Sequence, residues 1–496
     1  MKLPFDPARV AQAAHARAEA SSARVVIVTP QFNGEAQAEA ISEIVPPEFA
    51  DDAIALEFSS RFAGTLRYVD AWGKWMAWDG SVWRKDDTLR VYDLVRGICR
   101  RTSAEAKLPS LQSKIASAKT VAGVEKLARS DRRHAAAIDQ WDADIWKLNT
   151  PRGVVDLTSG ELLPSDPDLH MTKCAAVTPF GECPLWMSFL QTVTDNNIEL
   201  QAYLRRVAGY CLTGATTAQA MFFAYGTGQN GKSTFLNTLQ AIMGDYAMVA
   251  DADTFTATTM PRHLQELARL QGARLVVAQE TEEGKQLAEA RVKAITDGSP
   301  ITANMMRQNA FTYTPQFKLF ISGNHKPALR NVDVAISRRF NLIPFEVYIA
   351  PERRDDYLSV KLRDEWPGIL QWMVDGCLEW QEGNLQPPAA VQVATSEYFE
   401  AEDAFTLWAE QCCIRRRDLW EGATPLFRSW EKWAKSAGEQ PGSQKRFSST
   451  LESHGFKRTK SHGISVFHGI ELNITRTKDD PQRQENERGD LQPEID

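Results

Sequence analysis

The stretch that decides the fold of this chain reads MFFAYGTGQNGKSTF and runs from Met221 to Phe235. Its centre, from Gly226 to Ser233, fits the pattern G-x-x-x-x-G-K-[ST]. An apolar strand precedes this pattern, and apolar residues at helical spacing follow it as far as Gly244. Glycines allow backbone amides to turn towards phosphate oxygens, the lysine neutralises phosphate charge, and the serine hydroxyl binds Mg²⁺. The stretch therefore predicts a phosphate-binding loop between a strand and a helix.

The loop predicts binding of ATP with Mg²⁺, because its groups match a triphosphate and the metal that accompanies it. We expect Lys232 to contact the β- and γ-phosphates and Ser233 to bind the metal. The residues expected to contact the nucleotide are Gly226, Gly228, Asn230, Gly231, Lys232, Ser233 and Thr234.

Apolar strands alternate with helices over residues 221–345, which indicates an α/β domain built on a sheet. Glu280 follows the apolar run 274–278, where a metal-bound water must be oriented or deprotonated. We therefore expect Glu280 to be catalytic and to help hold the metal. Asn324 follows the run 318–322 and is expected to hold the attacking water or to sense the γ-phosphate. The alternatives are a helix cap for Glu280 and a turn former for Asn324.

Two arginines, Arg338 and Arg339, precede a third expected strand at 341–344. One interpretation is a pair of surface salt bridges. The other is a catalytic finger that reaches the γ-phosphate of a neighbouring subunit and stabilises transition-state charge there. The sequence does not decide which of the two arginines would be the finger.

Composition places the chain among ordinary globular proteins with several domains. It has 496 residues, of which 43% are hydrophobic and 24% charged, and its formal net charge is −7. No apolar run is long enough for a membrane span, and the N-terminus lacks the apolar core of a secretory leader. Neither the seven cysteines nor the eight histidines show zinc-finger spacing, so a structural zinc site is not expected. We expect the protein to lie in the cytoplasm of a bacterial host cell.

A local basic region offsets the acidic total near the C-terminus. Residues 424–478 contain ten Lys or Arg and four Asp or Glu, a pattern that fits a surface contacting phosphates. A helix from Thr424, a second helix over 443–453 and two strands within 456–472 indicate a winged-helix domain at 424–475. We expect a linker and helical connector at 384–423 and a disordered tail at 476–496.

A tryptophan-rich hairpin is expected upstream, with Asp79-Gly80 as a two-residue turn and Met76, Trp78 and Trp83 on one face. That face is interpreted as part of a core, with base stacking as the alternative. The predicted fold is multidomain α/β: an AAA+-like P-loop ATPase core, a helical N-terminal region and a C-terminal winged helix. Its predicted domains are an extension without an assigned role at 1–60, a helicase-associated domain at 61–200 and the ATPase domain at 201–383.

The ordered set of motifs resembles a superfamily 3 helicase and, more closely, the helicase portion of phage and plasmid primase–helicases. The set consists of the P-loop, the strand ending at Glu280, the segment Lys293–Tyr313, the strand ending at Asn324 and the arginine pair before Pro344-Phe345. The similarity extends upstream to Leu148–Leu162 and downstream to Tyr398, and it covers roughly residues 60–470.

The resemblance implies a ring, usually a hexamer, that uses ATP to move along single-stranded or forked DNA, usually 3′ to 5′. In such a ring the segment Lys293–Tyr313 is a hairpin that enters the channel, and Asn324 is the sensor. The residues that the resemblance places on DNA are Lys293, Arg307, Gln308 and Asn309 in the hairpin segment and Lys445 and Arg446 in the expected recognition helix. A separate primase or polymerase would be a further partner.

Three departures from the family pattern matter. Thr296-Asp297-Gly298-Ser299 stands where the family commonly has Thr-Gly-Gly-Asp, and Gln279 stands before Glu280 where many P-loop ATPases have an acid. Only about 60 residues precede the match, so we expect no primer synthesis by this chain. The competing hypotheses are a replication initiator or loader that uses ATP as an assembly switch, and a P-loop small-molecule kinase.

Overall fold

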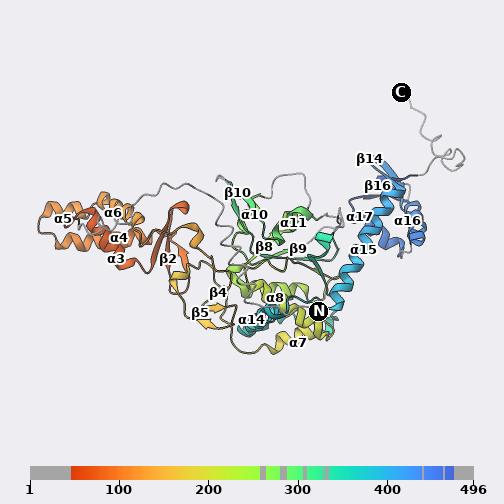
Figure 1. Ribbon diagram of the computed structural model, residues 1–496, viewed down its shortest axis with the longest axis horizontal. Helices are drawn as coiled ribbons and strands as arrows, with labels where there is room; N and C mark the ends of the chain where they lie inside the picture. Colours follow the sequence, from red (N-terminus) through yellow and green to blue (C-terminus); the bar gives the residue numbers. More distant parts are fainter. Residues whose placement is uncertain are drawn as a thin grey trace, which may run out of the picture. The chain divides into compact units, whose positions relative to one another are not determined.

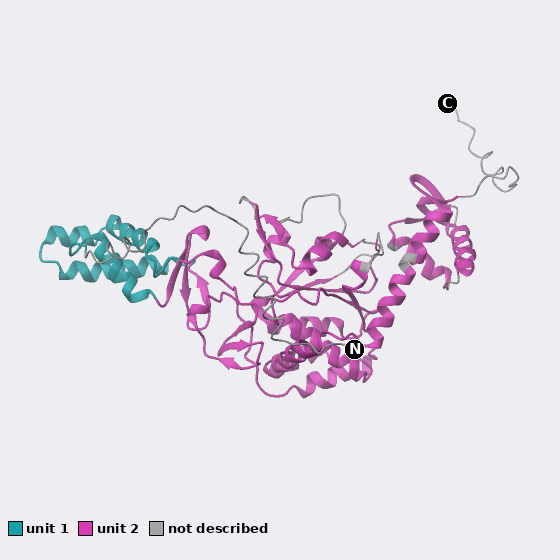
Figure 2. Ribbon diagram, viewed as in Figure 1, with its two compact units in different colours: residues 1–63, 87–135 teal, residues 64–86, 136–496 magenta. Residues whose placement is uncertain are grey.

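The structure is a computed structural model, and it describes residues 46–256, 264–279, 287–304, 310–327, 329, 334–437, 441–461 and 464–473. Two compact units make up the chain (Figure 2): unit 1 contains residues 1–63 and 87–135, and unit 2 contains residues 64–86 and 136–496. The predicted tail at 476–496 and most of the extension at 1–60 lie outside the described residues.

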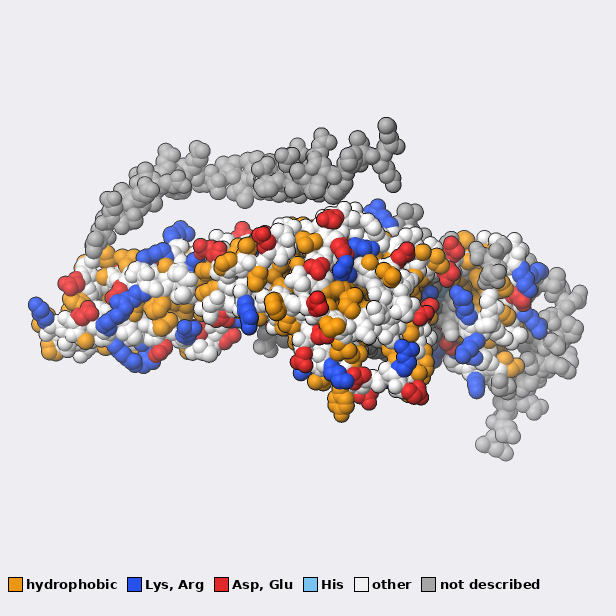
Figure 3. All heavy atoms as spheres, turned by 90° about the horizontal axis from the view of Figure 1, so that it is seen from below, with side chains coloured by type: hydrophobic (Ala, Val, Ile, Leu, Met, Phe, Trp, Pro, Cys, Tyr) orange, Lys and Arg blue, Asp and Glu red, His pale blue; other side chains and the backbone are white. Residues whose placement is uncertain are grey.

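Unit 1 is helical in its described part. Its helices are α3 (Asp51–Phe62), α4 (Arg90–Glu105), α5 (Pro109–Ile115) and α6 (Ala118–Ser130). Phe58, Val95 and Val124 are fully buried, so the helices share an apolar core. Lys and Arg side chains gather over this unit on the face that Figure 3 shows.

Unit 2 begins with an antiparallel sheet of β1 (Leu66–Val69), β2 (Lys74–Trp78) and β3 (Trp83–Lys85), in that order. Met76 and Trp83 belong to one apolar cluster, and Trp78 packs against it, so the predicted shared face is part of a core. The predicted two-residue turn is wrong, because Trp78 pairs with Trp83 across a four-residue turn. In that turn the Asp79 carboxylate accepts hydrogen bonds from the backbone amides of Ser81 and Val82, both at 2.9 Å.

A second small antiparallel sheet follows, formed by β4 (Lys147–Thr150), β5 (Gly153–Asp156) and β6 (Leu162–Leu163). The chain then forms two helices, α7 (Pro184–Val193) and α8 (Ile198–Leu212), before it enters the central sheet. Asn197 caps α8, because its side chain accepts a hydrogen bond from the Leu200 amide.

The central sheet of unit 2 has five parallel strands in the order β13-β7-β12-β9-β8. Their bounds are β7 (Met221–Tyr225), β8 (Ala247–Asp251), β9 (Leu275–Gln279), β12 (Lys318–Gly323) and β13 (Phe340–Pro344). The predicted α/β domain is confirmed by this sheet. Because all five strands run the same way, their carboxyl ends lie at one edge and their amino ends at the other.

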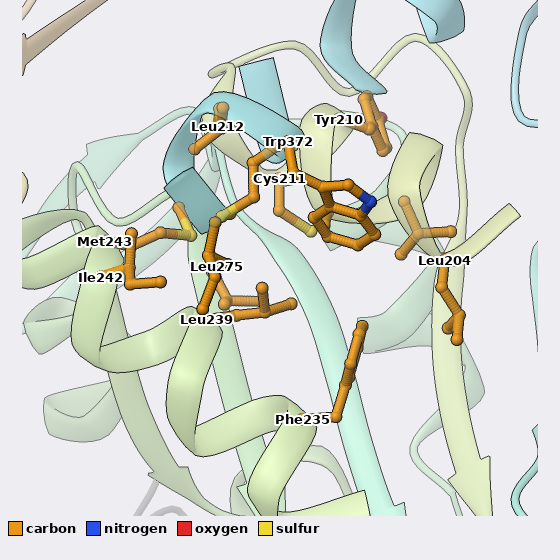
Figure 4. Packing of buried hydrophobic residues seen from close by; sticks show 14 of the residues in the cluster. Leu204, Tyr210, Cys211, Leu212, Phe235, Leu239, Ile242, Met243, Leu275 and Trp372 are labelled. Atoms are coloured by element: carbon orange, nitrogen blue, oxygen red, sulfur yellow. The ribbon is translucent and has the colours of Figure 1, made fainter. Parts of the chain in front are cut away.

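Both faces of the central sheet are covered by helices, as is usual for a parallel sheet. One core lies between the sheet and α7, α8, α9 (Lys232–Met243) and α14 (Trp366–Gly383). Figure 4 shows Phe235 and Leu239 of α9 in this core together with Leu204 of α8 and Trp372 of α14. The opposite core includes α10 (Leu264–Arg269), α11 (Glu289–Thr296), α12 (Val334–Ser337) and the first half of α15 (Ala389–Cys412).

The long helix α15 runs from the central sheet to the C-terminal part (Figure 1), and it contributes residues to two cores. Its Tyr398 and Phe399 pack on Phe340 at the start of β13. Further along the helix, Phe405 and Trp408 belong to the C-terminal core. The region predicted as a linker and connector is therefore largely one continuous helix.

The C-terminal part contains β14 (Cys413–Gly422), α16 (Ala423–Ala437), α17 (Gln444–Ser453), β15 (Lys457–Ser461) and β16 (Ile464–Leu472). Its sheet is antiparallel in the order β14-β16-β15. The two predicted helices and two predicted strands are present, and β14 is an additional strand. Within the described part of the chain, no helix is long and apolar enough to cross a membrane.

Candidate nucleotide-binding site

The predicted phosphate-binding loop lies at the carboxyl edge of the central sheet. It follows β7, while Asn324 follows the neighbouring strand β12 and Gln279 ends β9. Ligands of open α/β sheets bind at this edge, because loops from adjacent strands converge there. A cavity of about 320 Å³ is lined by Gly228, Gln229, Asn230, Gly231, Lys232, Ser233, Thr234, Gln279, Ser322, Gly323 and Asn324.

Two glycines of the loop cannot be replaced without displacing neighbouring atoms. A Cβ atom on Gly226 would lie 2.0 Å from the carbonyl oxygen of Phe345, and one on Gly231 would lie 2.4 Å from Cγ1 of Val193. Gly231 also has a φ of 84°, a value that favours glycine. The loop is therefore held against α7 on one side and against the end of β13 on the other.

Lys232 is the first residue of α9 and is only 5% exposed. Its Nζ atom donates hydrogen bonds to the carbonyl oxygen of Gly226 and, at 3.3 Å each, to the side-chain oxygens of Asn230 and Asn324. Burial lowers the pKa of this amine. Since these partners are neutral oxygens, a phosphate in the cavity would supply the charge that a buried ammonium needs.

Other residues expected to contact the nucleotide line the cavity beside this amine. Ser233 is exposed towards the solvent and Thr234 is half-buried, and both line the cavity. The Asn230 side chain donates to the Phe345 carbonyl oxygen at 2.7 Å, which fixes the loop to the end of β13. Glu280, expected as base and metal ligand, lies outside the described residues, although the preceding Gln279 lines the cavity.

The arginine pair lies at the opposite edge of the sheet. Both residues precede β13, whose amino end pairs with the amino end of β7. A five-residue strand spans about 15 Å, so neither arginine is near the phosphate-binding loop of its own chain. Arg339 is 3% exposed and forms an ion pair with Asp297, whereas Arg338 is exposed and donates to the Gln219 side chain at 3.3 Å.

The residues expected to contact DNA are spread over two parts of unit 2. Lys293 is half-buried on α11. The following strands β10 (Ile301–Asn304) and β11 (Ala310–Tyr313) pair antiparallel as a hairpin. The predicted tip residues Arg307, Gln308 and Asn309 lie outside the described residues. Lys445 and Arg446 are exposed in the first turn of α17, which the Ser443 side chain caps.

Sequence reasoning missed a contact between the phosphate-binding loop and the segment after β13. Ile349 donates its amide to the Gln229 carbonyl oxygen at 3.0 Å, and Arg354 donates to the Gln229 side chain. Nothing in the residue pattern after β13 signals this contact, because the segment is neither periodic nor glycine-rich. Only the strand order brings residue 354 beside residue 229.

Comparisons with known proteins match two families and several viral relatives. The family described as D5 N terminal like matches residues 55–195, and a family of unknown function (DUF5906) matches residues 224–339. A putative helicase L207/L206 of Acanthamoeba polyphaga mimivirus is 24% identical over 269 residues, which are 50% of this chain and 28% of that protein. A putative helicase 022R of Frog virus 3 (isolate Goorha) is 23% identical over 291 residues, which are 53% of this chain and 29% of that protein.

A third relative is Primase D5 of Fowlpox virus (strain NVSL), 24% identical over 170 residues, which are 33% of this chain and 21% of that protein. The chain is related to the phage-type primase–helicases. These matches support a resemblance to the C-terminal portion of the phage-type primase–helicases, as the order of motifs predicted. Each match covers less than a third of the viral protein concerned.

Among solved structures, the C-terminal region of NrS-1 (residues 305–718) is similar to this chain with a TM-score of 0.42. The sequence identity is 10%, and the superposition covers 85% of this chain and 99% of the other.

Proposed function

We propose that this chain is an ATP-dependent DNA helicase of the superfamily 3 type that acts in replication as a ring of six subunits. The observation that supports this most is Lys232, a buried amine with neutral partners in a cavity between the loop after β7 and Asn324. A triphosphate with Mg²⁺ fits such a cavity, because the loop amides and the lysine bind phosphate and the Ser233 hydroxyl binds the metal.

In this proposal the polar groups at the cavity divide the steps of ATP hydrolysis among them. Lys232 neutralises the β- and γ-phosphates, and Ser233 binds Mg²⁺, with Glu280 near the metal. Glu280 accepts a proton from the attacking water. Asn324 orients that water or senses the γ-phosphate, and its hydrogen bond with Lys232 supports this role.

The position of the arginine pair supports a ring of AAA+-like ATPase domains. Within one chain the pair lies at the sheet edge opposite the phosphate-binding loop. A head-to-tail contact between subunits brings such opposite edges together, and repeated contacts of this kind close into a ring. We assign the finger to Arg338, because Arg339 is buried in its ion pair with Asp297 and Arg338 is exposed.

Two elements are proposed to contact DNA. The hairpin of β10 and β11 would carry Arg307, Gln308 and Asn309 into the channel, with Lys293 near its base. The C-terminal order α15, β14, α16, α17, β15, β16 fits a winged helix in which α17 is the recognition helix and β15–β16 the wing. Lys445 and Arg446 would then contact the DNA backbone through their exposed side chains.

The proposal is tested by unwinding of a forked DNA duplex by the purified oligomer in ATP and Mg²⁺, with 3′- and 5′-tailed substrates to read polarity. We expect DNA-stimulated ATP hydrolysis, unwinding from a 3′ tail, and loss of both in Lys232→Ala with ring assembly retained. Lys361→Ala is the matched control, since that lysine is exposed and its ion pair with Asp355 involves no residue assigned to ATP or DNA. Absence of both DNA-stimulated ATP hydrolysis and unwinding in an intact oligomer would refute the helicase proposal.

A second candidate is an initiator or loader that binds origin DNA and uses ATP only to assemble. The exposed pair Lys445 and Arg446, on a compact domain joined to the ATPase by α15, favours it. This candidate predicts ATP-dependent assembly on duplex DNA with little strand separation. The same substrates therefore distinguish the two, because only the helicase releases the displaced strand.

A further inference from the structure

The cavity beside the phosphate-binding loop is suited to phosphates and not to a nucleobase. Among the described residues, its lining consists of glycines and of polar side chains such as Asn230, Lys232 and Ser322, without an aromatic or aliphatic residue. A nucleobase is a flat, largely apolar ring that proteins bind by stacking on aromatic side chains. If this cavity holds the triphosphate, the base must therefore lie on another surface next to the loop.

An exposed tyrosine, Tyr348, is linked to this loop through Arg354. Gln229, which lines the cavity, accepts a hydrogen bond from the Ile349 amide at 3.0 Å, and its side-chain oxygen accepts one from Arg354. The guanidinium of Arg354 also donates to the hydroxyl of Tyr348 at 3.1 Å and lies 5.4 Å from the centre of that ring. One guanidinium thus connects the loop to the tyrosine.

Tyr348 remains 65% exposed despite these contacts. A tyrosine that served only to cover a core would be buried. The backbone behind it is fixed, since Arg354 donates from Nε to the Ile349 carbonyl oxygen at 2.8 Å and the Phe345 carbonyl accepts from Asn230 at 2.7 Å. The ring is therefore an exposed flat surface on a segment that is anchored to the phosphate-binding loop at two points.

We propose that Tyr348 and Arg354 form the subsite for the base of the bound nucleoside triphosphate. The base stacks on the Tyr348 ring, and Arg354 positions that ring relative to the loop through Gln229. The terminal nitrogen of Arg354 that has no partner among the described residues donates to an acceptor on the base or ribose. The subsite rests on the proposed function, because it needs the triphosphate to occupy the neighbouring cavity.

The test compares two ligands that share a triphosphate but differ in the base. Binding of Mg²⁺–ATP and of Mg²⁺–tripolyphosphate is measured by titration calorimetry for the whole chain and for Tyr348→Ala. We expect Tyr348→Ala to weaken ATP binding about ten-fold, which corresponds to about 1.4 kcal/mol, and to leave tripolyphosphate binding unchanged. Arg354 is not substituted, because its loss would also release the segment from the loop.

Two control variants separate stacking from other effects. Tyr348→Phe keeps the ring and its contact with the Arg354 guanidinium but loses the hydroxyl, so it should retain most of the ATP affinity that Tyr348→Ala loses. Tyr357→Ala removes another tyrosine of the same region, 71% exposed, and should change neither affinity.

The outcomes separate the subsite from the proposed function. Unchanged ATP binding by Tyr348→Ala, or an equal loss for both ligands, would overturn the subsite while leaving the phosphate site in place. Failure of the unaltered chain to bind either ligand would overturn both proposals at once.

Discussion

Asp297→Ala should destabilise the chain well beyond an ordinary surface substitution. Arg339 is 3% exposed, and its guanidinium is paired with the Asp297 carboxylate, which is 31% exposed. Removing one partner of a fully buried ion pair costs about 3–5 kcal/mol, and an exposed pair is worth about 0–1 kcal/mol. Because one partner here is buried and the other is partly exposed, we expect a loss of about 2 kcal/mol.

The measurement is urea unfolding followed by tryptophan fluorescence, with a second variant that completes a double-mutant cycle. Asp297→Ala combined with Arg339→Met should recover part of the loss, since the buried charge is then absent. Glu431→Ala, which breaks the exposed pair with Lys435, should cost less than about 0.5 kcal/mol. A loss below 0.5 kcal/mol for Asp297→Ala, or strict additivity in the cycle, would refute the role assigned to this ion pair.

Two further perturbations test other parts of the chain. Arg338→Ala should abolish ATP hydrolysis while ATP binding is retained, and mixing it with Lys232→Ala subunits should restore partial hydrolysis; no recovery in mixed oligomers would contradict a finger acting between subunits. In unit 1, burial raises the pKa of Asp131, but hydrogen bonds from Arg133 outweigh this effect and lower it from 3.8 to about 2. A carboxyl group whose pKa is lowered by folding stabilises the folded state when the pH is above its ordinary pKa of 3.8. This contribution is lost as the pH falls from 3.8 towards 2. Asp131→Asn should lack that pH-dependent loss in thermal unfolding midpoints, and an unchanged pH profile would contradict it.

The strand, loop and helix around Gly226–Ser233 were predictable because the residues that determine them are consecutive in the sequence. Glycine, lysine and serine at fixed spacing determine the local backbone, and the apolar runs on either side determine the strand and the helix. The strand ends were predictable for the same reason, since apolar runs such as 318–322 stop at a polar residue. The coarse α/β class followed from their alternation.

Contacts between distant residues were not predictable in this way. The burial of Arg339 depends on Asp297, 42 positions earlier, and the link from Arg354 to Gln229 depends on β13 lying beside β7. Strand β14 was missed because most of its residues are charged or exposed, so it lacks an alternating apolar pattern. The turn after Trp78 was misjudged because Asp79 caps it through its side chain and lengthens it.

Helix α15 limits which insertions and deletions the chain can accept between its central sheet and its C-terminal core. Phe399 packs on the central sheet and Phe405 on the C-terminal core, with unbroken helix between them. An α-helix turns by about 100° and rises about 1.5 Å per residue, so inserting or deleting one residue there would turn one core about the helix axis relative to the other. The number of residues between the two phenylalanines therefore fixes both the distance between the two cores and their rotation about the helix axis. A loop, which tolerates changes in length, would fix neither.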